Sequence, residues 1–256
     1  MFFAPPITRI KTIVATMAMA GLAACGAAAL PGEGVINDPA EAQNRAIYDF
    51  NVAVDRTLVR PASVGVGTIL PQPVRQGIGN FASNLDQPRY VLNNLLQLRF
   101  EEALQNTWRF AINSTIGLGG LLDPASGIGL YEVDTDFGET LHVWGAPEGA
   151  YVVLPILGPS TGRDTVGFVV DRAMNPLRFF IETPESYYAS AATIGNALDT
   201  RYRFGDTIDD LYYNSADGYA AARILYLSNR RFELRGAAQD DYFDPYNDAY
   251  EDPNAQ

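Results

Sequence analysis

Apolar residues recur at helical spacing near the middle of the chain, and this stretch limits the possible folds most strongly. It comprises Leu92, Leu95, Leu96, Phe100, Leu104, Trp108 and Ile112. Residues three or four apart lie on one side of a helix, but this series drifts and covers a very wide face. Such a helix is either buried in a core or turned toward lipid, and periodicity cannot separate the two. Taken alone, the pattern favours a buried core.

The chain begins with the parts of a secretory signal. Arg9 and Lys11 precede an apolar stretch from Thr12 to Leu22, and small residues follow. This stretch is shorter than the roughly 20 apolar residues that span a bilayer. The run Leu22-Ala23-Ala24-Cys25 resembles a bacterial lipobox, which implies that Cys25 is lipidated and becomes the first residue after cleavage. The alternative is a structural cysteine after an ordinary secretory signal.

The remaining chain is long enough for one domain with flanking segments. Residues 1–24 are predicted to be the signal peptide, and residues 25–37 a lipidated N-terminus and linker rich in Ala, Gly and Pro. We expect one helical domain over residues 38–235. Residues 236–256 contain acidic but no basic residues and are predicted to be a disordered acidic tail.

Capping residues and prolines predict a mainly α-helical fold with eight or more helices. Asp38 and Pro39 are typical of a helix start, and this helix should end near Arg60 because Pro61 follows. The remaining expected helices run from Pro71 to about Leu85, after Pro88 through Ile112, from Ser160 or Thr161 to about Met174, from Thr183 to about Arg203, from Asp206, and from Tyr219 to Leu234. The only strand signal is the run Tyr151–Leu154.

Composition excludes several classes of function. The chain has 30 acidic and 18 basic residues, a net charge of -12, so it lacks the positive surface that nucleic-acid binding needs. Lys11 is the only lysine and His142 the only histidine, which removes P-loops, Schiff-base lysines and most nucleophilic triads. The acidic residues Glu132, Asp134, Asp136 and Glu139 could be a metal site, but a solvated loop is the more usual interpretation.

Several segments in a fixed order resemble the MlaA (VacJ) lipoprotein family and cover nearly all of residues 37–231. They are Asn37-Asp38-Pro39, Asn44-Arg45, Phe50-Asn51, Pro71-Gln72-Pro73-Val74-Arg75, Asn80-Phe81, Asn84-Leu85, Asn93-Asn94-Leu95-Leu96-Gln97, Arg109-Phe110, Asn113-Ser114-Thr115, Gly117-Leu118-Gly119-Gly120, Asp136-Phe137-Gly138-Glu139-Thr140-Leu141, Leu154-Pro155, Gly158-Pro159-Ser160-Thr161 and Arg163-Asp164. The chain departs from the family pattern at Leu98 and Arg99, where a turn glycine is usual, and at His142, where a small residue is usual.

The resemblance implies a helical ring with an amphipathic central pore, embedded in the inner leaflet of the outer membrane and facing the periplasm. It implies a passive channel that removes mislocalised phospholipid from the outer leaflet and passes it to a periplasmic lipid-binding shuttle. It also implies association with a trimeric porin. The wide apolar ladder would then face lipid, which reverses the first interpretation.

The resemblance also implies roles for particular residues. Phe50 and Asn51 would set the resting state of the channel, and Gly117, Gly119 and Gly120 would let the backbone bend or hinge beside the pore. Separately, Ser160, Thr161 and Arg163 begin a helix, where a lipid headgroup could bind, although plain capping is the more usual role.

Two alternatives stay open at this point. The first is a structural lipoprotein that binds porins without moving lipid. The second is a lipid hydrolase using carboxylates with His142. We expect no enzyme, no catalytic residue, no metal and no cofactor beyond covalent lipid on Cys25.

Overall fold

The computed structural model of the protein describes residues 36–179 and 185–235, and these form a mainly helical fold. The helices are α2 (Glu41–Val54), α3 (Arg60–Ile69), α4 (Gln72–Leu96), α5 (Phe100–Thr115), α6 (Pro124–Gly127), α7 (Phe137–Val143), α8 (Gly162–Met174), α9 (Glu185–Arg203), α10 (Gly205–Asp209) and α11 (Gly218–Arg235), with π-helical turns η2 (Asp55–Val59) and η4 (Asp210–Asn214) and a 3-10 turn η3 (Pro176–Phe179). The strands β1 (Tyr151–Leu154) and β2 (Gly158–Thr161) form one antiparallel hairpin.

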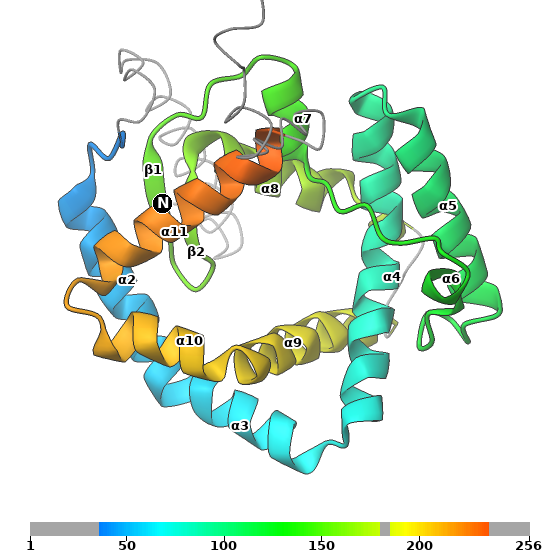
Figure 1. Cartoon of the computed structure of the whole chain (residues 1–256), viewed down its shortest axis with the longest axis horizontal. Helices are drawn as coiled ribbons and strands as arrows, with labels where there is room; N and C mark the ends of the chain where they lie inside the picture. Colours follow the sequence, from blue (N-terminus) through cyan, green and yellow to red (C-terminus); the bar gives the residue numbers. More distant parts are fainter. Residues whose placement is uncertain (1–35, 180–184, 236–256) are drawn as a thin grey trace, which may run out of the picture.

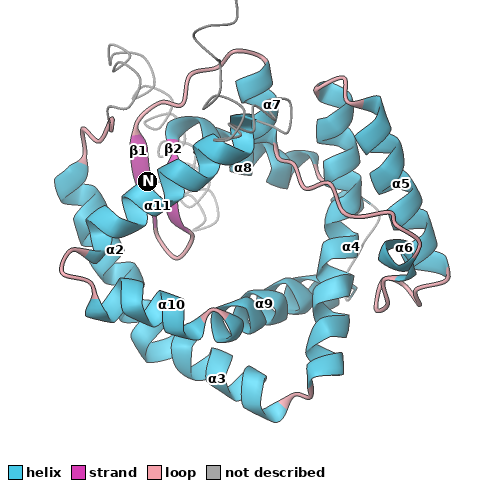
Figure 2. Ribbon diagram, in the orientation of Figure 1, coloured by secondary structure: helices cyan, strands magenta, loops and turns pink. Residues whose placement is uncertain are grey.

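The elements follow one another around a ring (Figure 1). α4 packs along α5, which lies on the outer side of the ring, and α9 packs against both α3 and α4 (Figures 1 and 2). α7 packs against α8, and α11 crosses in front of the β-hairpin. This arrangement puts α4, α8, α9 and α11 around a common centre.

The first helix does not end at Pro61, contrary to the prediction. It continues through η2 into α3 as far as Ile69. In an α-helix the proline ring collides with the carbonyl four residues back. Here the preceding turn is π-helical, and the amide of Arg60 donates to the carbonyl of Asp55, five residues back. We attribute the continuity to this wider turn, which gives the proline ring room.

Two further predictions about α2 and α4 were wrong in detail. α2 begins after Ala40, and Asp38 does not cap it; its carboxylate instead accepts hydrogen bonds from Asn44, Tyr219 and Arg223. This carboxylate therefore ties the start of α2 to α11. α4 does not break at Pro88 but runs unbroken for 25 residues. The helix expected after Pro88 and through Ile112 is instead divided after Leu96, and α5 packs back beside α4.

The turn between α4 and α5 keeps its geometry without a glycine. Leu98 has φ +62°, a left-handed conformation that glycine adopts far more readily than leucine. The amide of Arg99 donates to the carbonyl of Asn94, which closes the turn. The departure from the family pattern thus leaves the turn in place and adds backbone strain.

Two asparagines of α2 hold the β-hairpin. Asn44 donates to the carbonyl of Tyr151 and accepts from the amide of Val153, at 3.1 and 3.0 Å. Asn51, two helical turns later, donates to the carbonyl of Leu154 at 2.9 Å and accepts from the amide of Ile156 at 2.7 Å. Strand β1 was expected, whereas β2 and α7 were not, because their sequences carry many turn formers and polar residues.

The interior of the described domain is largely polar. One small apolar cluster lies between α2, the hairpin and α11, and it contains Tyr48, Tyr151, Val153, Tyr219, Ala222 and Leu227. Elsewhere the buried positions are rich in side-chain amides, namely Asn44, Asn51, Asn84, Gln87, Asn93, Asn94, Gln97, Asn106 and Asn113. Many of these amides hydrogen-bond to backbone or to other polar groups, as Asn106 does to both the amide and carbonyl of Val133.

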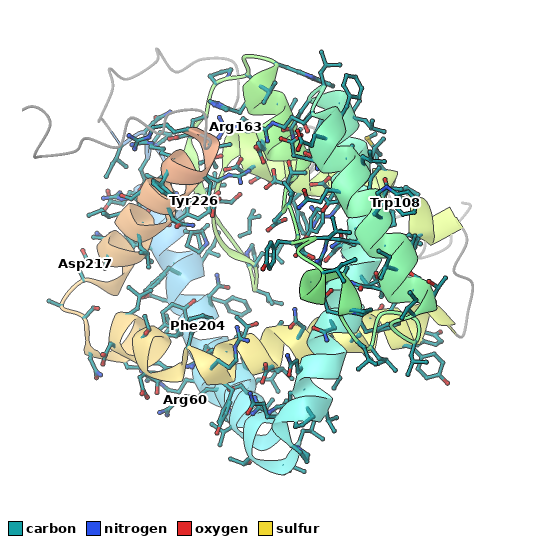
Figure 3. The ribbon with its side chains drawn as sticks, turned by 45° about the vertical axis from the view of Figure 1, so that its right-hand side comes forward. Arg60, Trp108, Arg163, Phe204, Asp217 and Tyr226 are labelled. Carbon is teal, nitrogen blue, oxygen red and sulfur yellow. The ribbon has the colours of Figure 1, made fainter. Side chains whose placement is uncertain are left out.

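Most of the apolar ladder lies on the outside of the ring, with Leu92, Leu96 and Ile112 half-buried, so the interpretation as a buried core was wrong. Phe100 is 65% exposed, Leu104 57% and Trp108 55%, and Trp108 lies on the outside of the α4–α5 hairpin (Figure 3). The face of α5 toward the protein carries Asn106 and Arg109 instead. Among the described residues, no helix has both the length and the apolarity needed to cross a membrane.

Candidate functional site

Two adjoining cavities lie inside the described part of the ring. The larger, of about 890 Å³, is lined mainly by residues of α4, α8, α9 and α11. The smaller, of about 580 Å³, is lined by residues of α2, the β-hairpin, α11 and the segment around α10 and η4. Tyr226 and Asn229 of α11 line both cavities, so the two spaces meet at this helix.

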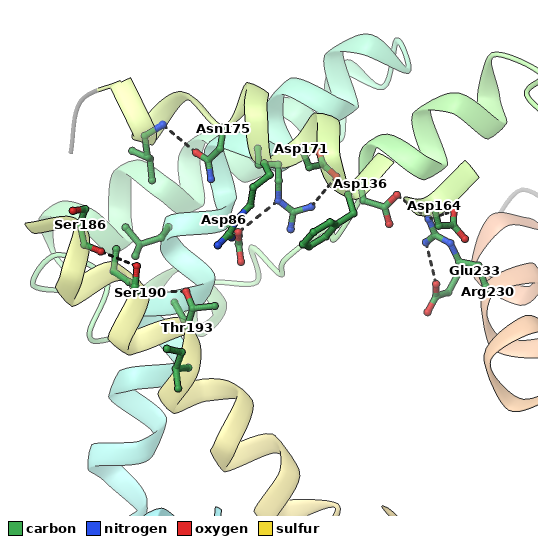
Figure 4. A pocket seen from close by; sticks show the side chains of 18 of the residues that line it. Asp86, Asp136, Asp164, Asp171, Asn175, Ser186, Ser190, Thr193, Arg230 and Glu233 are labelled. Atoms are coloured by element: carbon green, nitrogen blue, oxygen red, sulfur yellow. Dashed lines mark hydrogen bonds and ion pairs between the residues drawn. The ribbon is translucent and has the colours of Figure 1, made fainter. Parts of the chain in front are cut away.

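One group of charges in the larger cavity centres on Arg89 of α4. Its guanidinium lies 3.5 Å from Asp86 and 3.5 Å from Asp171 of α8 (Figure 4). Asp171 also accepts hydrogen bonds from the side chain of Asn93 at 2.7 Å and the amide of Phe137 at 2.9 Å. Burial raises the pKa of the Asp86 carboxyl, and the nearby Arg89 only partly offsets this.

A second group of charges centres on Arg230 of α11. Its guanidinium lies 2.7 Å from Asp136, 3.2 Å from Asp164 and 3.3 Å from Glu233 (Figure 4). The hydroxyl of Tyr226 donates to Asp164 at 2.8 Å. Burial alone would raise the pKa of Asp164, but the charge of Arg230 and several hydrogen bonds outweigh burial, so this pKa lies below its ordinary value.

The rest of the larger cavity combines hydroxyl groups with apolar side chains. Ser186, Ser190 and Thr193 line it from α9 (Figure 4). The apolar lining consists of Ala82, Leu85, Phe168, Leu177, Ala189 and Ile194. This cavity is therefore amphipathic, and an occupant with both charged and apolar parts could find matching surfaces in it.

The smaller cavity is lined mostly by apolar and aromatic side chains. They include Tyr48, Val153, Phe204, Leu211, Tyr212 and Leu225. Phe204 and Tyr226 come from different sides of the ring (Figure 3). The two spaces together therefore place a charged region beside an apolar one.

Phe50 and Asn51 lie in different surroundings. Phe50 is half exposed, whereas Asn51 is buried, lines the smaller cavity and holds the turn after β1. Ile156 in that turn has φ +69°, which is unfavourable for a β-branched residue. The role of Phe50 and Asn51 in the resting state of the channel stays a prediction. Asn51 could act through its hydrogen bonds to the turn after β1.

The three predicted glycines follow α5, and Gly120 packs against Asn84 of α4. A Cβ on Gly117 would lie 2.5 Å from the carbonyls of Asn113 and Leu122. Gly119 has φ +74°, and Gly120 has φ +97° with the side chain of Asn84 within 2.7 Å of its Cβ position. The backbone here needs glycine, but none of the three lines either cavity, and the hinge role stays a prediction.

Ser160, Thr161 and Arg163 are all buried and lie at the start of α8. Thr161 caps this helix, as expected, by accepting a hydrogen bond from the amide of Asp164 at 3.2 Å. Arg163 lies 3.4 Å from Asp164 and 3.4 Å from Nδ1 of His142. None of the three lines a cavity, so headgroup contact stays a prediction without support from their positions.

Other predicted features lie elsewhere. Cys25, the signal peptide 1–24 and the tail 236–256 are outside the described residues. Asp136, from the acidic patch, caps α7 and pairs with Arg230. His142 lies on α7 with its side chain largely exposed, and partial loss of solvent together with the charge of Arg163 lowers the pKa of its imidazole. No group of three potential metal ligands comes together among the described residues.

Arg89 and Arg230 were missed as residues of the site. They are 141 positions apart, and nothing in either helix marks them as facing the same space. Arg89 follows the polar run Asp86-Gln87-Pro88, and Arg230 lies in the polar run Ser228-Asn229-Arg230-Arg231, so each looks like an ordinary surface position in the sequence.

Comparison with known proteins identifies the family. A sequence model described as "MlaA lipoprotein" matches residues 36–233. The chain belongs to the MlaA lipoprotein family. The resemblance seen in the sequence is confirmed, as is the mainly helical, MlaA-like fold.

Several relatives of this MlaA-family protein align over most of their length. "Intermembrane phospholipid transport system lipoprotein MlaA" of Haemophilus influenzae is 34% identical over 202 residues, 77% of this chain and 79% of the relative. The protein of the same name from Escherichia coli K12 is 33% identical over 204 residues, 78% and 79% of the two chains. A solved structure described as "Structural basis for maintenance of bacterial outer membrane lipid asymmetry" has 31% identity and a TM-score of 0.67, covering 77% of this chain and 98% of the other.

Proposed function

We propose that this protein is an outer-membrane lipoprotein that conducts phospholipid from the outer leaflet through its ring to a periplasmic lipid-binding shuttle. The observation that carries the proposal is the inverted distribution of polarity: large apolar side chains lie outside the α4–α5 hairpin, whereas an amphipathic cavity lies inside the ring. The names of the relatives from Haemophilus influenzae and Escherichia coli, which refer to intermembrane phospholipid transport, support it.

The physical basis is the cost of moving a headgroup through hydrocarbon. Buried polar groups without partners cost several kcal/mol each, so a phospholipid crosses slowly unless its headgroup stays in polar surroundings. The charges and hydroxyls of the larger cavity would supply those surroundings. Transfer of this kind needs no nucleophile and no cofactor, and a channel without energy coupling is passive.

We further propose that the ring is set in the inner leaflet and held there by covalent lipid on Cys25. The exposed apolar side chains of α5, such as Phe100 and Trp108, would contact acyl chains. The domain would then face the periplasm, beside a trimeric porin and within reach of the shuttle. No nucleic acid and no metal ion enters this proposal.

Cells lacking the protein test the proposal when they are complemented with matched variants. Ala189 lines the larger cavity from α9, whereas Ala191 on the same helix is exposed and lines neither cavity. Ala189→Phe should fill the cavity and fail to lower outer-leaflet phospholipid, measured by a membrane-impermeant headgroup label. Ala191→Phe, at equal protein level, should restore the normal distribution.

The same experiment separates the structural alternative. A lipoprotein that only binds porins would give equal lipid exposure for Ala189→Phe and Ala191→Phe at normal porin levels. Cys25→Ser tests the anchor, because the unlipidated protein should be lost from the outer membrane and should leave exposure high. Normal attachment of Cys25→Ser would contradict the anchoring proposal.

A further inference from the structure

The larger cavity carries more carboxylates than guanidinium groups. Five acidic side chains line it against three arginines. Both groups of charges share one pattern, an arginine placed between two or more carboxylates: Arg89 between Asp86 and Asp171, and Arg230 among Asp136, Asp164 and Glu233. Arg172 also lines the cavity on the α4–α8 side, so two arginines face Asp86 and Asp171 there, and the surplus negative charge lies around Arg230.

We propose that this charge pattern makes the cavity selective for zwitterionic phospholipids with a primary ammonium group, such as phosphatidylethanolamine, over anionic ones such as phosphatidylglycerol. This inference rests on the proposed function, and it assigns the selecting groups to the arginine-centred clusters of α4, α8 and α11.

The argument follows from how each headgroup would enter an existing ion pair. A phosphate must take donors from Arg89 or Arg230, and this releases a carboxylate from its arginine. The ammonium of phosphoethanolamine can neutralise the released carboxylate, so every charge keeps a partner. A phosphoglycerol headgroup has no cation, so the released carboxylate stays uncompensated next to the phosphate, which is unfavourable away from bulk water.

Two details support the exchange. The guanidinium of Arg230 is shared among three carboxylates, so a phosphate oxygen can replace one of them while the arginine keeps the other two. Asp86 is held less firmly than Asp171: both lie 3.5 Å from Arg89, but Asp171 also accepts hydrogen bonds from Asn93 and from the amide of Phe137. The side chain of Asp86 is also 44% exposed, so a cation in the cavity could reach it.

The test removes surplus acid without touching the arginines. In one double variant, Asp86→Asn is combined with Glu233→Gln, because these are the more exposed acids of the two clusters, at 44% and 50% of their side chains. The matched control combines Asp49→Asn with Glu101→Gln. Both control positions are exposed and neither lines a cavity, so the net charge of the chain changes equally.

Full-length lipidated protein would be incubated with nanodiscs of equimolar phosphatidylethanolamine and phosphatidylglycerol so that bound lipid can exchange. The protein would then be repurified, and the amount of each lipid bound to it measured by mass spectrometry. Ala189→Phe defines the lipid bound outside the cavity, and this amount is subtracted. The wild type and the control should retain at least about threefold more phosphatidylethanolamine than phosphatidylglycerol. The double variant at Asp86 and Glu233 should bring the ratio close to one.

Other outcomes overturn distinct claims. Equal retention of the two lipids by the wild type, or a preference for phosphatidylglycerol, would overturn the selectivity inference while leaving the conduit intact. The selectivity inference would also be overturned if the double variant at Asp86 and Glu233 retained the two lipids in the same ratio as the control. Wild-type protein that retains no more lipid than Ala189→Phe would instead overturn the proposed function.

Discussion

Replacing Asn51 with alanine should release the end of the β-hairpin from α2. The side chain of Asn51 makes two hydrogen bonds to the turn, one to the carbonyl of Leu154 and one from the amide of Ile156. Both partners are backbone groups, and Ile156 is held at φ +69°. Loss of the amide therefore leaves a strained turn with two unpaired polar groups.

The expected magnitude follows from these contacts. The two hydrogen bonds are part-buried, so each backbone group that loses its partner costs about 1 kcal/mol, the low end of the roughly 1–3 kcal/mol for a fully buried group. The hairpin end should therefore open more easily by about 2 kcal/mol. Since 1.4 kcal/mol corresponds to tenfold, the amide of Ile156 should exchange with solvent about 30 times faster.

Hydrogen exchange of the purified protein in detergent measures this directly. Gln43→Ala is the matched control, because Gln43 is exposed on α2 and shares the helix but not the contact. Exchange at Ile156 that rises by less than about threefold over the control would refute the reasoning. In cells, Asn51→Ala should also change outer-leaflet phospholipid exposure if the hairpin sets the resting state of the channel.

Four further predictions concern stability. Leu98→Gly should raise the unfolding free energy by about 0.5–1 kcal/mol in thermal unfolding, because glycine removes the left-handed strain, and a lower unfolding temperature would contradict this. Gly120→Ala should lower it by about 2 kcal/mol, because φ is +97° and Asn84 leaves no room for a Cβ; an unchanged unfolding temperature would show that the loop relaxes. Asp164, whose pKa is lowered, stabilises the fold above about pH 4 and loses this effect as the pH falls through its folded pKa. Asp164→Asn should therefore lower the unfolding temperature at pH 7 and matter little in strong acid. Asp86→Asn should leave the unfolding temperature at pH 7 unchanged or raised, since the pKa of Asp86 is raised and its charged form is the unfavourable one.

Much of the helical content could be predicted from the sequence because local signals determine it. Thr161 caps α8 as expected, and that helix ends at Met174 as the pattern indicates. The helix breaks predicted at two prolines were wrong. Pro61 follows a π-helical turn, and Pro88 lies in a helix that packs along α5, so tertiary context outweighed the local preference for a break.

The direction of the apolar ladder could not be settled from periodicity. Leu104 and Trp108 have the spacing of a core helix, and only the positions of Asn106 and Arg109 on the opposite face show which side is buried. Buried amides at this spacing are unusual for a protein with an apolar core, and they provide the signal that periodicity alone lacked.

The charged lining of the cavity was beyond sequence reasoning for a different reason. Arg89 meets Asp171, and Arg230 meets Asp136, across 82 and 94 positions of the chain. Each of these side chains is ordinary on its own helix. Their relation exists only because the ring brings α4, α8 and α11 around one space.

The central claim is that phospholipid occupies the cavity inside the ring. A photo-crosslinking amino acid placed at Ala189, which lines the larger cavity, tests it most directly in living cells. The control is the same amino acid at the exposed position Ala191. The account predicts a phospholipid adduct, identified by mass spectrometry, that is strong at position 189 and weak at position 191. Equal adducts at both positions, or none at position 189, would contradict it.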